Sequence, residues 1–288
     1  MPRPANFTRQ SENFVDKFRR EHHYHLIPLY YLLRLSDFAR EGMEHSGSYR
    51  FADHMYRGVP SGRGLLGRWL DALLLGLPAS RSMRHRCFES RNAMLRAFRQ
   101  HIRSEDGEPF RVLTIPCGLP RDVRDFADRL AGEDPDLVSH IDYTGMDIDP
   151  GVVEEAARFL ANSAIPEPTF QVGDALNFED FPRSQPQFIA STGLGEFLDD
   201  PELAKFYDHV FDCLAPGGIF FTSAAACGRG SEKLLRAFEL NVRYRTKTEL
   251  DPLLRGKPWK SVRYTRDAIG LQTFVLAVKG TVPASFGF

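Results

Sequence analysis

The chain has 288 residues, which is enough to bury the core of one large domain or of one domain with an added cap. Its 37 Lys and Arg nearly balance its 38 Asp and Glu, so no long-range field would attract nucleic acid or an anionic membrane. We therefore expect a small-molecule substrate, no nucleic acid and no membrane as partners, and either a monomer or a homodimer.

The apolar stretches of the chain are short and interrupted. The longest, Leu65 to Leu77, contains Arg68 and Asp71, and the first residues, Met1 to Phe7, lack the apolar core of a signal peptide. A cytoplasmic location is therefore expected.

The cysteines are widely spaced and form no C-x-x-C pair, so they predict neither a zinc site nor a disulfide framework. They are Cys87, Cys117, Cys213 and Cys227. We expect no metal site.

The first third of the chain has helical patterns near residues 8–20, 25–42, 62–77 and 81–103, separated by breaks rich in Gly, Ser and Pro. They predict an all-helical cap over residues 1–107. Seven arginines lie between Arg81 and Arg103, and their spacing favours a solvated helix face over a nucleic-acid site.

Strands and helices alternate over residues 108–288. Short apolar runs typical of buried parallel strands lie at 110–115, 143–146, 169–172, 187–191 and 218–223. Two further runs, 260–266 and 272–279, bracket a turn and predict a closing antiparallel hairpin. The predicted fold class is α/β, with a seven-stranded, mostly parallel sheet flanked by helices.

Ligands of open α/β sheets bind beyond the carboxyl ends of the strands, so the residues that follow each strand are the candidate site. Gly118, after the first strand, permits a close backbone turn, and a plain tight turn is the alternative. Asp147, after the second, can accept both hydroxyls of a ribose. Asp149 precedes Pro150 and predicts the cap of the next helix.

The third and fourth strands also lead into polar residues. Asp174 is placed to accept from an exocyclic amine such as adenine N6, with a turn after Gly173 as the alternative. The loop Ser191-Thr-Gly-Leu-Gly-Glu196 ends in a carboxylate that is either functional or simply favourable to a helix dipole.

Over about residues 108–280 the sequence resembles class I S-adenosylmethionine-dependent methyltransferases. The matching segments are Val112–Pro120, Gly145–Asp149, Gly173–Ala175 and Ala215–Gly218. The resemblance implies a Rossmann-like fold with S-adenosylmethionine as cofactor. It implies cofactor contacts from Pro116, Cys117, Gly118 and Ile148, from Asp147 at the ribose hydroxyls, from Asp174 and Ala175 at the adenine, and from Ser191, Thr192 and Gly193 near the sulfonium.

The first motif departs from the family pattern, because Pro116 and Pro120 stand where the family has glycines. Proline removes an amide donor, so this loop is a poor phosphate cradle and argues against a dinucleotide. S-adenosylmethionine carries no phosphate. Arg121 is a candidate to bind the methionine carboxylate in place of the missing donors, and a solvated side chain is the alternative.

The segment containing Tyr49, Asp53, His54 and Tyr56 is flanked by glycines and is predicted to cover the cofactor, where aromatic faces would stabilise a sulfonium. Helical core is the alternative interpretation. Tyr49, His54, Tyr56 and Glu196 are the candidate catalytic residues. A general base is needed only if the nucleophile arrives protonated, and the sequence does not choose among them.

The leading hypothesis is a transferase that moves the cofactor's methyl group to a small metabolite by in-line displacement at the sulfonium, as in small-molecule biosynthesis. One alternative is a cyclase in which the cofactor's own α-amine attacks its Cγ, giving azetidine-2-carboxylate and methylthioadenosine. The second is a non-catalytic cofactor-binding partner protein, suggested by the irregular first motif.

Overall fold

The computed structural model describes residues 14–20, 22–44, 48–104, 107–226 and 242–280. The described residues divide into two compact units, one within residues 14–85 and the other within residues 86–226 and 242–280. We call them the helical unit and the sheet unit. The division lies inside a long helix, α6 (Pro78–Ser104), and not near residue 107, because Met94 and Phe98 of this helix belong to the core of the sheet unit.

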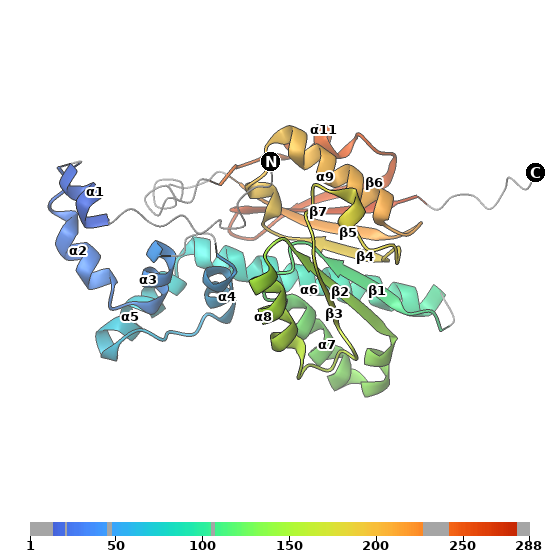
Figure 1. Ribbon diagram of the computed structural model, residues 1–288, viewed down its shortest axis with the longest axis horizontal. Helices are drawn as coiled ribbons and strands as arrows, with labels where there is room; N and C mark the ends of the chain where they lie inside the picture. Colours follow the sequence, from blue (N-terminus) through green and yellow to red (C-terminus); the bar gives the residue numbers. More distant parts are fainter. Residues whose placement is uncertain (1–13, 21, 45–47, 105–106, 227–241, 281–288) are drawn as a thin grey trace, which may run out of the picture. The chain divides into compact units, whose positions relative to one another are not determined.

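The sheet has seven strands in the order β3-β2-β1-β4-β5-β7-β6, which confirms the predicted fold class (Figure 1). The first five strands pair in parallel, and β7 is antiparallel to both β5 and β6. The strands are β1 (Phe110–Thr114), β2 (Ile141–Asp147), β3 (Thr169–Val172), β4 (Phe188–Ser191), β5 (Ile219–Ala225), β6 (Trp259–Arg266) and β7 (Gln272–Lys279).

Helices cover both faces of the sheet (Figure 1). On one face lie α6, α7 (Arg121–Glu133) and α8 (Pro150–Leu160), and on the other lie α9 (Asp200–Cys213) and α11 (Lys247–Leu254). Val112 faces the first layer and the next residue, Leu113, faces the second. This alternation is the period of two that a strand buried on both faces requires.

Three short 3-10 helices complete the sheet unit, η1 (Pro135–His140), η2 (Phe178–Asp180) and η3 (Leu194–Glu196). Asp149 caps α8 as expected, since its side chain accepts the amide of Gly151 at 2.8 Å. At the start of α9, Asp199 and Glu202 form a capping box.

The helical unit contains α1 (Phe14–Arg20), α2 (Leu26–Leu33), α3 (Asp37–Glu44), α4 (Tyr49–Arg57) and α5 (Gly64–Leu75). The helix expected over 25–42 is two helices, because Ser36 starts a new one by accepting the amide of Ala39 at 2.9 Å. The glycine-flanked segment is helix α4, which Ser48 caps at its start and Gly58, at φ 63°, closes at its end.

None of the described helices is long and apolar enough to cross a membrane. The described residues also contain no cluster of three or more His, Cys, Asp and Glu side chains that could hold a metal ion.

Candidate functional site

The candidate site lies where the strand order reverses, between β1 and β4. The loop after β1 bridges the neighbouring strands. The amide of Ile115 donates to the carbonyl of Ala190 on β4 at 2.9 Å, and the amide of Cys117 donates to the carbonyl of Met146 on β2 at 2.8 Å. Gly118 follows with φ 47°, a left-handed conformation that favours glycine.

Asp147 ends β2 directly beside this loop. Its carboxylate accepts the amide of Gly118 on Oδ2 and the amide of Asp149 on Oδ1, both at 3.2 Å. Burial raises the pKa of Asp147, while the amides of Asp149 and Gly118 oppose the rise. Each carboxylate oxygen has capacity for a further donor. The next residue, Ile148, is exposed.

Cys117 is buried next to Asp147. Burial, and then the charge of Asp147, raise the pKa of its thiol, so the thiol stays protonated at neutral pH. Cys117 therefore contributes its backbone and its packing to the loop and no thiolate nucleophile.

The end of β3 forms a tight turn. The Asp174 carboxylate accepts the amide of Leu176 at 2.9 Å, while the amide of Asp174 donates to Asp180 at 2.8 Å. The turn interpretation of Asp174 is thus realised, and its predicted contact with adenine stays a prediction. The carbonyl of Ala175 lies 3.2 Å from the ring of His209.

Beyond β4, Ser191 is buried and its hydroxyl has no hydrogen-bond partner among the described residues. Thr192 is half-buried, and Gly193 has φ 92°. A Cβ on Gly193 would lie 3.1 Å from Arg86 Nη1, so the loop needs glycine both for its conformation and for this close approach.

Glu196, at the end of η3, is buried against Arg86 of α6. Its Oε1 lies 3.6 Å from Arg86 Nη1, and Oε1 has no hydrogen-bond partner within the described parts of the chain. Burial raises the pKa of Glu196, whereas Arg86 and hydrogen bonds with Gln272 and the Ala225 backbone act to lower it. Glu196 lies in the single turn of η3, and the longer helix α9 begins only at Asp200.

The sequence did not single out Arg86 or Gln272. Arg86 was assigned to a solvated helix face, and that was wrong for this residue, whose side chain is only 5% exposed. Gln272 reaches Glu196 because β7 runs antiparallel to β5 and pairs Gln272 with Ala225. Neither contact leaves a local pattern in the sequence.

The sequence did not single out Arg245 either. Its guanidinium donates to the carbonyl of Gly195, to the carbonyl of Leu198 at 2.7 Å and to the carboxylate of Asp200 at 2.8 Å. The amide of Arg243 donates to the carbonyl of Glu196 at 2.8 Å. These bonds fix the loop that carries Glu196.

Arg121 begins α7, and its guanidinium lies over the ring of Phe159 on α8, 5.1 Å from the ring centre. A bond to a cofactor carboxylate stays a prediction for this residue, and it would compete with this cation–π contact.

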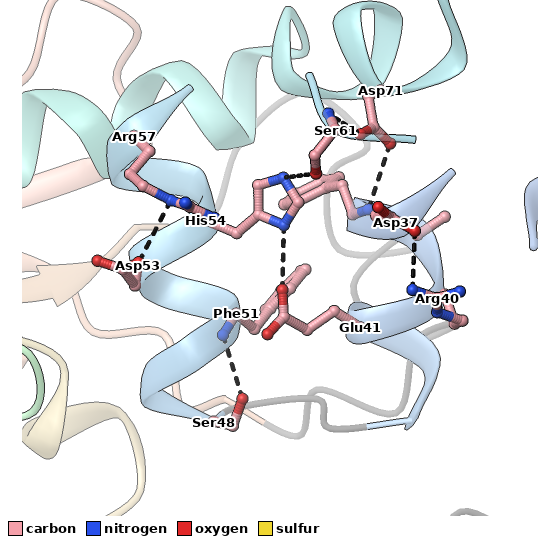
Figure 2. A network of polar contacts seen from close by, with 12 residues as sticks. Asp37, Arg40, Glu41, Ser48, Phe51, Asp53, His54, Arg57, Ser61 and Asp71 are labelled. Carbon is pink, nitrogen blue, oxygen red and sulfur yellow. Dashed lines mark hydrogen bonds and ion pairs between the residues drawn. The ribbon is translucent and has the colours of Figure 1, made fainter. Parts of the chain in front are cut away.

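The candidate residues of the cap lie in the helical unit. Figure 2 shows the His54 ring between Glu41, 3.0 Å from Nδ1, and Ser61, 3.4 Å from Nε2. His54 is buried, and each of its ring nitrogens has a contact inside the unit, as in the helical-core interpretation.

The other three members of the glycine-flanked segment are also on α4. The Tyr49 hydroxyl lies 3.1 Å from Arg50 Nε, and Asp53 pairs with Arg57 at 3.4 Å. Tyr56 is half-buried. The catalytic roles predicted for Tyr49, His54 and Tyr56 stay predictions.

The residues at the strand ends fit a phosphate-free nucleoside. Asp147 presents acceptors for hydroxyl groups, and Pro116 and Pro120, which have no amide hydrogen, leave few donors in the first loop to cradle a phosphate. Ser191 and Glu196 add buried polar atoms that lack partners in the described chain. Such atoms are typical of sites that a ligand completes.

A family model described as "Putative methyltransferase" matches residues 33–279. A comparison with curated proteins finds no match. Among solved structures, a possible exported protein from Bordetella parapertussis is 20% identical, with a TM-score of 0.72 and coverage of 88% of this chain and 87% of that one.

Two further solved structures share the fold at lower identity. The CurJ carbon methyltransferase is 13% identical, with a TM-score of 0.55 and coverage of 94% of this chain and 70% of that one. The S-adenosylmethionine-dependent methyltransferase SibL is 14% identical, with a TM-score of 0.51 and coverage of 92% and 77%.

Proposed function

The chain belongs to a family of class I S-adenosylmethionine-dependent methyltransferases, and from this premise we propose that it methylates a small-molecule acceptor by in-line displacement at the sulfonium. The observation that supports the cofactor site best is the position of Asp147 at the carboxyl end of β2, bonded to Gly118. When bound, the cofactor supplies an electrophilic methyl group, so the protein needs chiefly to position the nucleophile and exclude water.

In this proposal Asp147 accepts the ribose hydroxyls, Ile148 beside it contacts the cofactor, and Asp174 and Ala175 contact the adenine. The backbone of Pro116, Cys117 and Gly118 approaches the cofactor from the first loop, and Ser191, Thr192 and Gly193 line the floor near the reacting carbon. Arg121 binds the methionine carboxylate if it leaves the Phe159 ring.

Glu196 is the base that the geometry favours for an acceptor that arrives protonated. It lies in the same unit as the cofactor residues, on the loop that follows β4, and its Oε1 has no hydrogen-bond partner in the described residues. His54, by contrast, already contacts Glu41 and Ser61. Tyr49 and Tyr56 remain alternatives on the helical unit.

The test is incubation of the purified protein with S-adenosylmethionine, alone and with a panel of small acceptors, followed by mass spectrometry of the nucleoside products. S-adenosylhomocysteine formed only with an acceptor supports methyl transfer. Methylthioadenosine released without an acceptor would instead support the cyclase and contradict methyl transfer. Cofactor binding without turnover across the panel would favour the non-catalytic partner protein.

A further inference from the structure

The orientation of α5 in the helical unit is fixed by a buried acid. Asp71 is fully buried, and its Oδ2 accepts the amides of Ser61 at 2.8 Å and Gly62 at 2.7 Å. Its Oδ1 accepts the amide of Phe38 at 3.2 Å and the Ser36 hydroxyl. Four donors converge on this one carboxylate, so α5 cannot rotate about its axis without breaking buried hydrogen bonds.

With its acid turned inward, α5 presents leucine and tryptophan to the solvent. Leu65 is 89% exposed, Trp69 is 61% exposed and Leu73 is 52% exposed. These residues are four apart and form one stripe along the helix, and Leu66 lies beside it, also exposed. The helix therefore has the reverse of the usual surface pattern, in which apolar side chains face the core.

A second exposed apolar group lies on and just before α2. It consists of Tyr24, Leu29, Tyr31 and Leu32, all at least 40% exposed. Helices α2 and α5 belong to one small core, because Tyr30 of α2 and Leu74 of α5 both pack against Ala39 and Met43 of α3. We call the exposed side chains of α2 and α5 the apolar surface. Neighbouring exposed apolar side chains on surface helices are a mark of interaction sites.

The charged residues around α5 indicate what binds to the apolar surface. Residues 58–80 contain two exposed arginines, Arg63 and Arg68, and their single acid is the buried Asp71. Around α5, leucine and tryptophan lie beside arginine, and residues 58–80 contain no exposed acid, which is the pattern of helices that lie in the headgroup layer of a membrane.

We propose that the apolar surface of the helical unit docks on a lipid surface with anionic headgroups. The helices lie on that surface and do not span it. The balanced charge of the whole chain predicted no membrane partner, since it gives no long-range attraction. Attachment here depends on the local apolar side chains and two arginines, which act only at contact.

The test uses the full-length protein and vesicles of phosphatidylcholine, with or without phosphatidylglycerol. The chain has two tryptophans, and Trp259 packs against Phe211 and Phe220 in the sheet unit, so Trp69 reports on the apolar surface. Phosphatidylglycerol vesicles should sediment the protein and shift the emission of Trp69 to the blue. Leu65→Gln with Trp69→Gln should weaken sedimentation on the order of tenfold or more.

Phe88→Gln is the matched control, because Phe88 is half-exposed on α6 in the sheet unit, and it should sediment like the wild type. Arg63→Gln with Arg68→Gln should remove the difference between the two vesicle types. Absence of sedimentation with the wild type would overturn the proposal. So would a dimer, measured by light scattering, that the Leu65→Gln and Trp69→Gln changes convert to a monomer, since the second copy would then be the occupant.

Discussion

Asp147 Oδ2 accepts the backbone amide of Gly118 at 3.2 Å, so the acid that ends β2 also holds the loop that follows β1. The two strands pair in parallel, with Thr114 opposite Gly145, and their carboxyl ends are therefore adjacent. The carboxylate proposed to bind the ribose thus also shapes the backbone proposed to approach the cofactor.

Asp147→Asn should weaken the binding of S-adenosylmethionine by about tenfold or more, because an amide offers one acceptor oxygen where the carboxylate offers two charge-assisted ones. Isothermal titration calorimetry measures the change. Asp149→Asn is the matched control, since Asn also caps helices and the Asp149 side chain accepts the amide of Gly151 at the start of α8. Equal losses in the two variants would show that Asp147 acts only through the fold.

Cofactor binding should weaken toward acid pH earlier than an ordinary aspartate would dictate. Burial raises the pKa of Asp147, and ribose hydroxyls need its ionised form, so affinity is full above this pKa and is lost as the pH falls through it. The same raised pKa affects the free energy of unfolding with the opposite dependence on pH. A raised folded-state pKa contributes stability below the unfolded-state pKa, and this is lost as the pH rises through the folded-state value.

Calorimetric titrations across the acid range measure this dependence for the wild type and for Asp147→Asn. The variant should bind weakly with a flatter profile. If the affinity of the variant falls with pH in the same way as that of the wild type, a group other than Asp147 causes the loss at acid pH.

Arg245→Lys should destabilise the sheet unit by about 2–3 kcal/mol, because lysine cannot reproduce the fork that reaches Gly195, Leu198 and Asp200. Urea unfolding measures this. Arg255→Lys is the control, since Arg255 pairs with Asp251 at an exposed position where the solvent screens the pair, so this variant should unfold at nearly the same urea concentration as the wild type.

Arg245 is a positioning residue for Glu196, so its loss should lower kcat for the acceptor reaction while the Kd for S-adenosylmethionine changes little. A variant with reduced stability but an unaltered kcat would limit Arg245 to a structural role.

Asp71→Asn should destabilise the helical unit by about 2–4 kcal/mol. The amide turns one acceptor oxygen into a donor, which leaves either the amides of Ser61 and Gly62 or the donors on Oδ1 without an acceptor. Limited proteolysis and thermal unfolding measure the effect. Asp37→Asn should change little, because the Asp37 carboxylate contacts the partly exposed Arg40.

Two glycine-to-alanine substitutions should change the stability of the protein in opposite directions. A Cβ on Gly67 would lie 2.3 Å from the carbonyl oxygen of Leu35, so Gly67→Ala should cost about 1–3 kcal/mol by forcing the backbones apart. A Cβ on Gly132 in α7 would meet nothing within 4 Å, so Gly132→Ala should stabilise the protein by roughly 0.5–1 kcal/mol. Differential scanning calorimetry of both variants checks the pair, and a shift of the same sign would contradict it.

The strands could be predicted closely because each is a short apolar run bounded by turn residues. The runs expected at 169–172 and 272–279 coincide with β3 and β7, and the expected hairpin is present. Helix α4 was missed, although Ser48 and Gly58 are ordinary helix-ending residues, because its flanking glycines were interpreted as hinges.

The candidate site was only half predictable. Asp147 and Gly118 follow their strands directly, so the topology alone places them at the sheet edge. Arg86 and Gln272 reach Glu196 from a helix before the first strand and from the last strand of the sheet. Contacts over such separations depend on how the elements pack, and no local spacing encodes them.

The antiparallel insertion of β7 between β5 and β6 has a consequence for synthesis. The chain is made from its first residue onward, and Gln272 meets Glu196 only once β7 has paired with β5. A nascent chain whose first five strands have emerged can already hold Asp147 beside Gly118, yet the polar group around Glu196 is still incomplete. The contacts around Glu196 therefore depend on the last strand to be synthesised, whereas the contact between Asp147 and Gly118 does not.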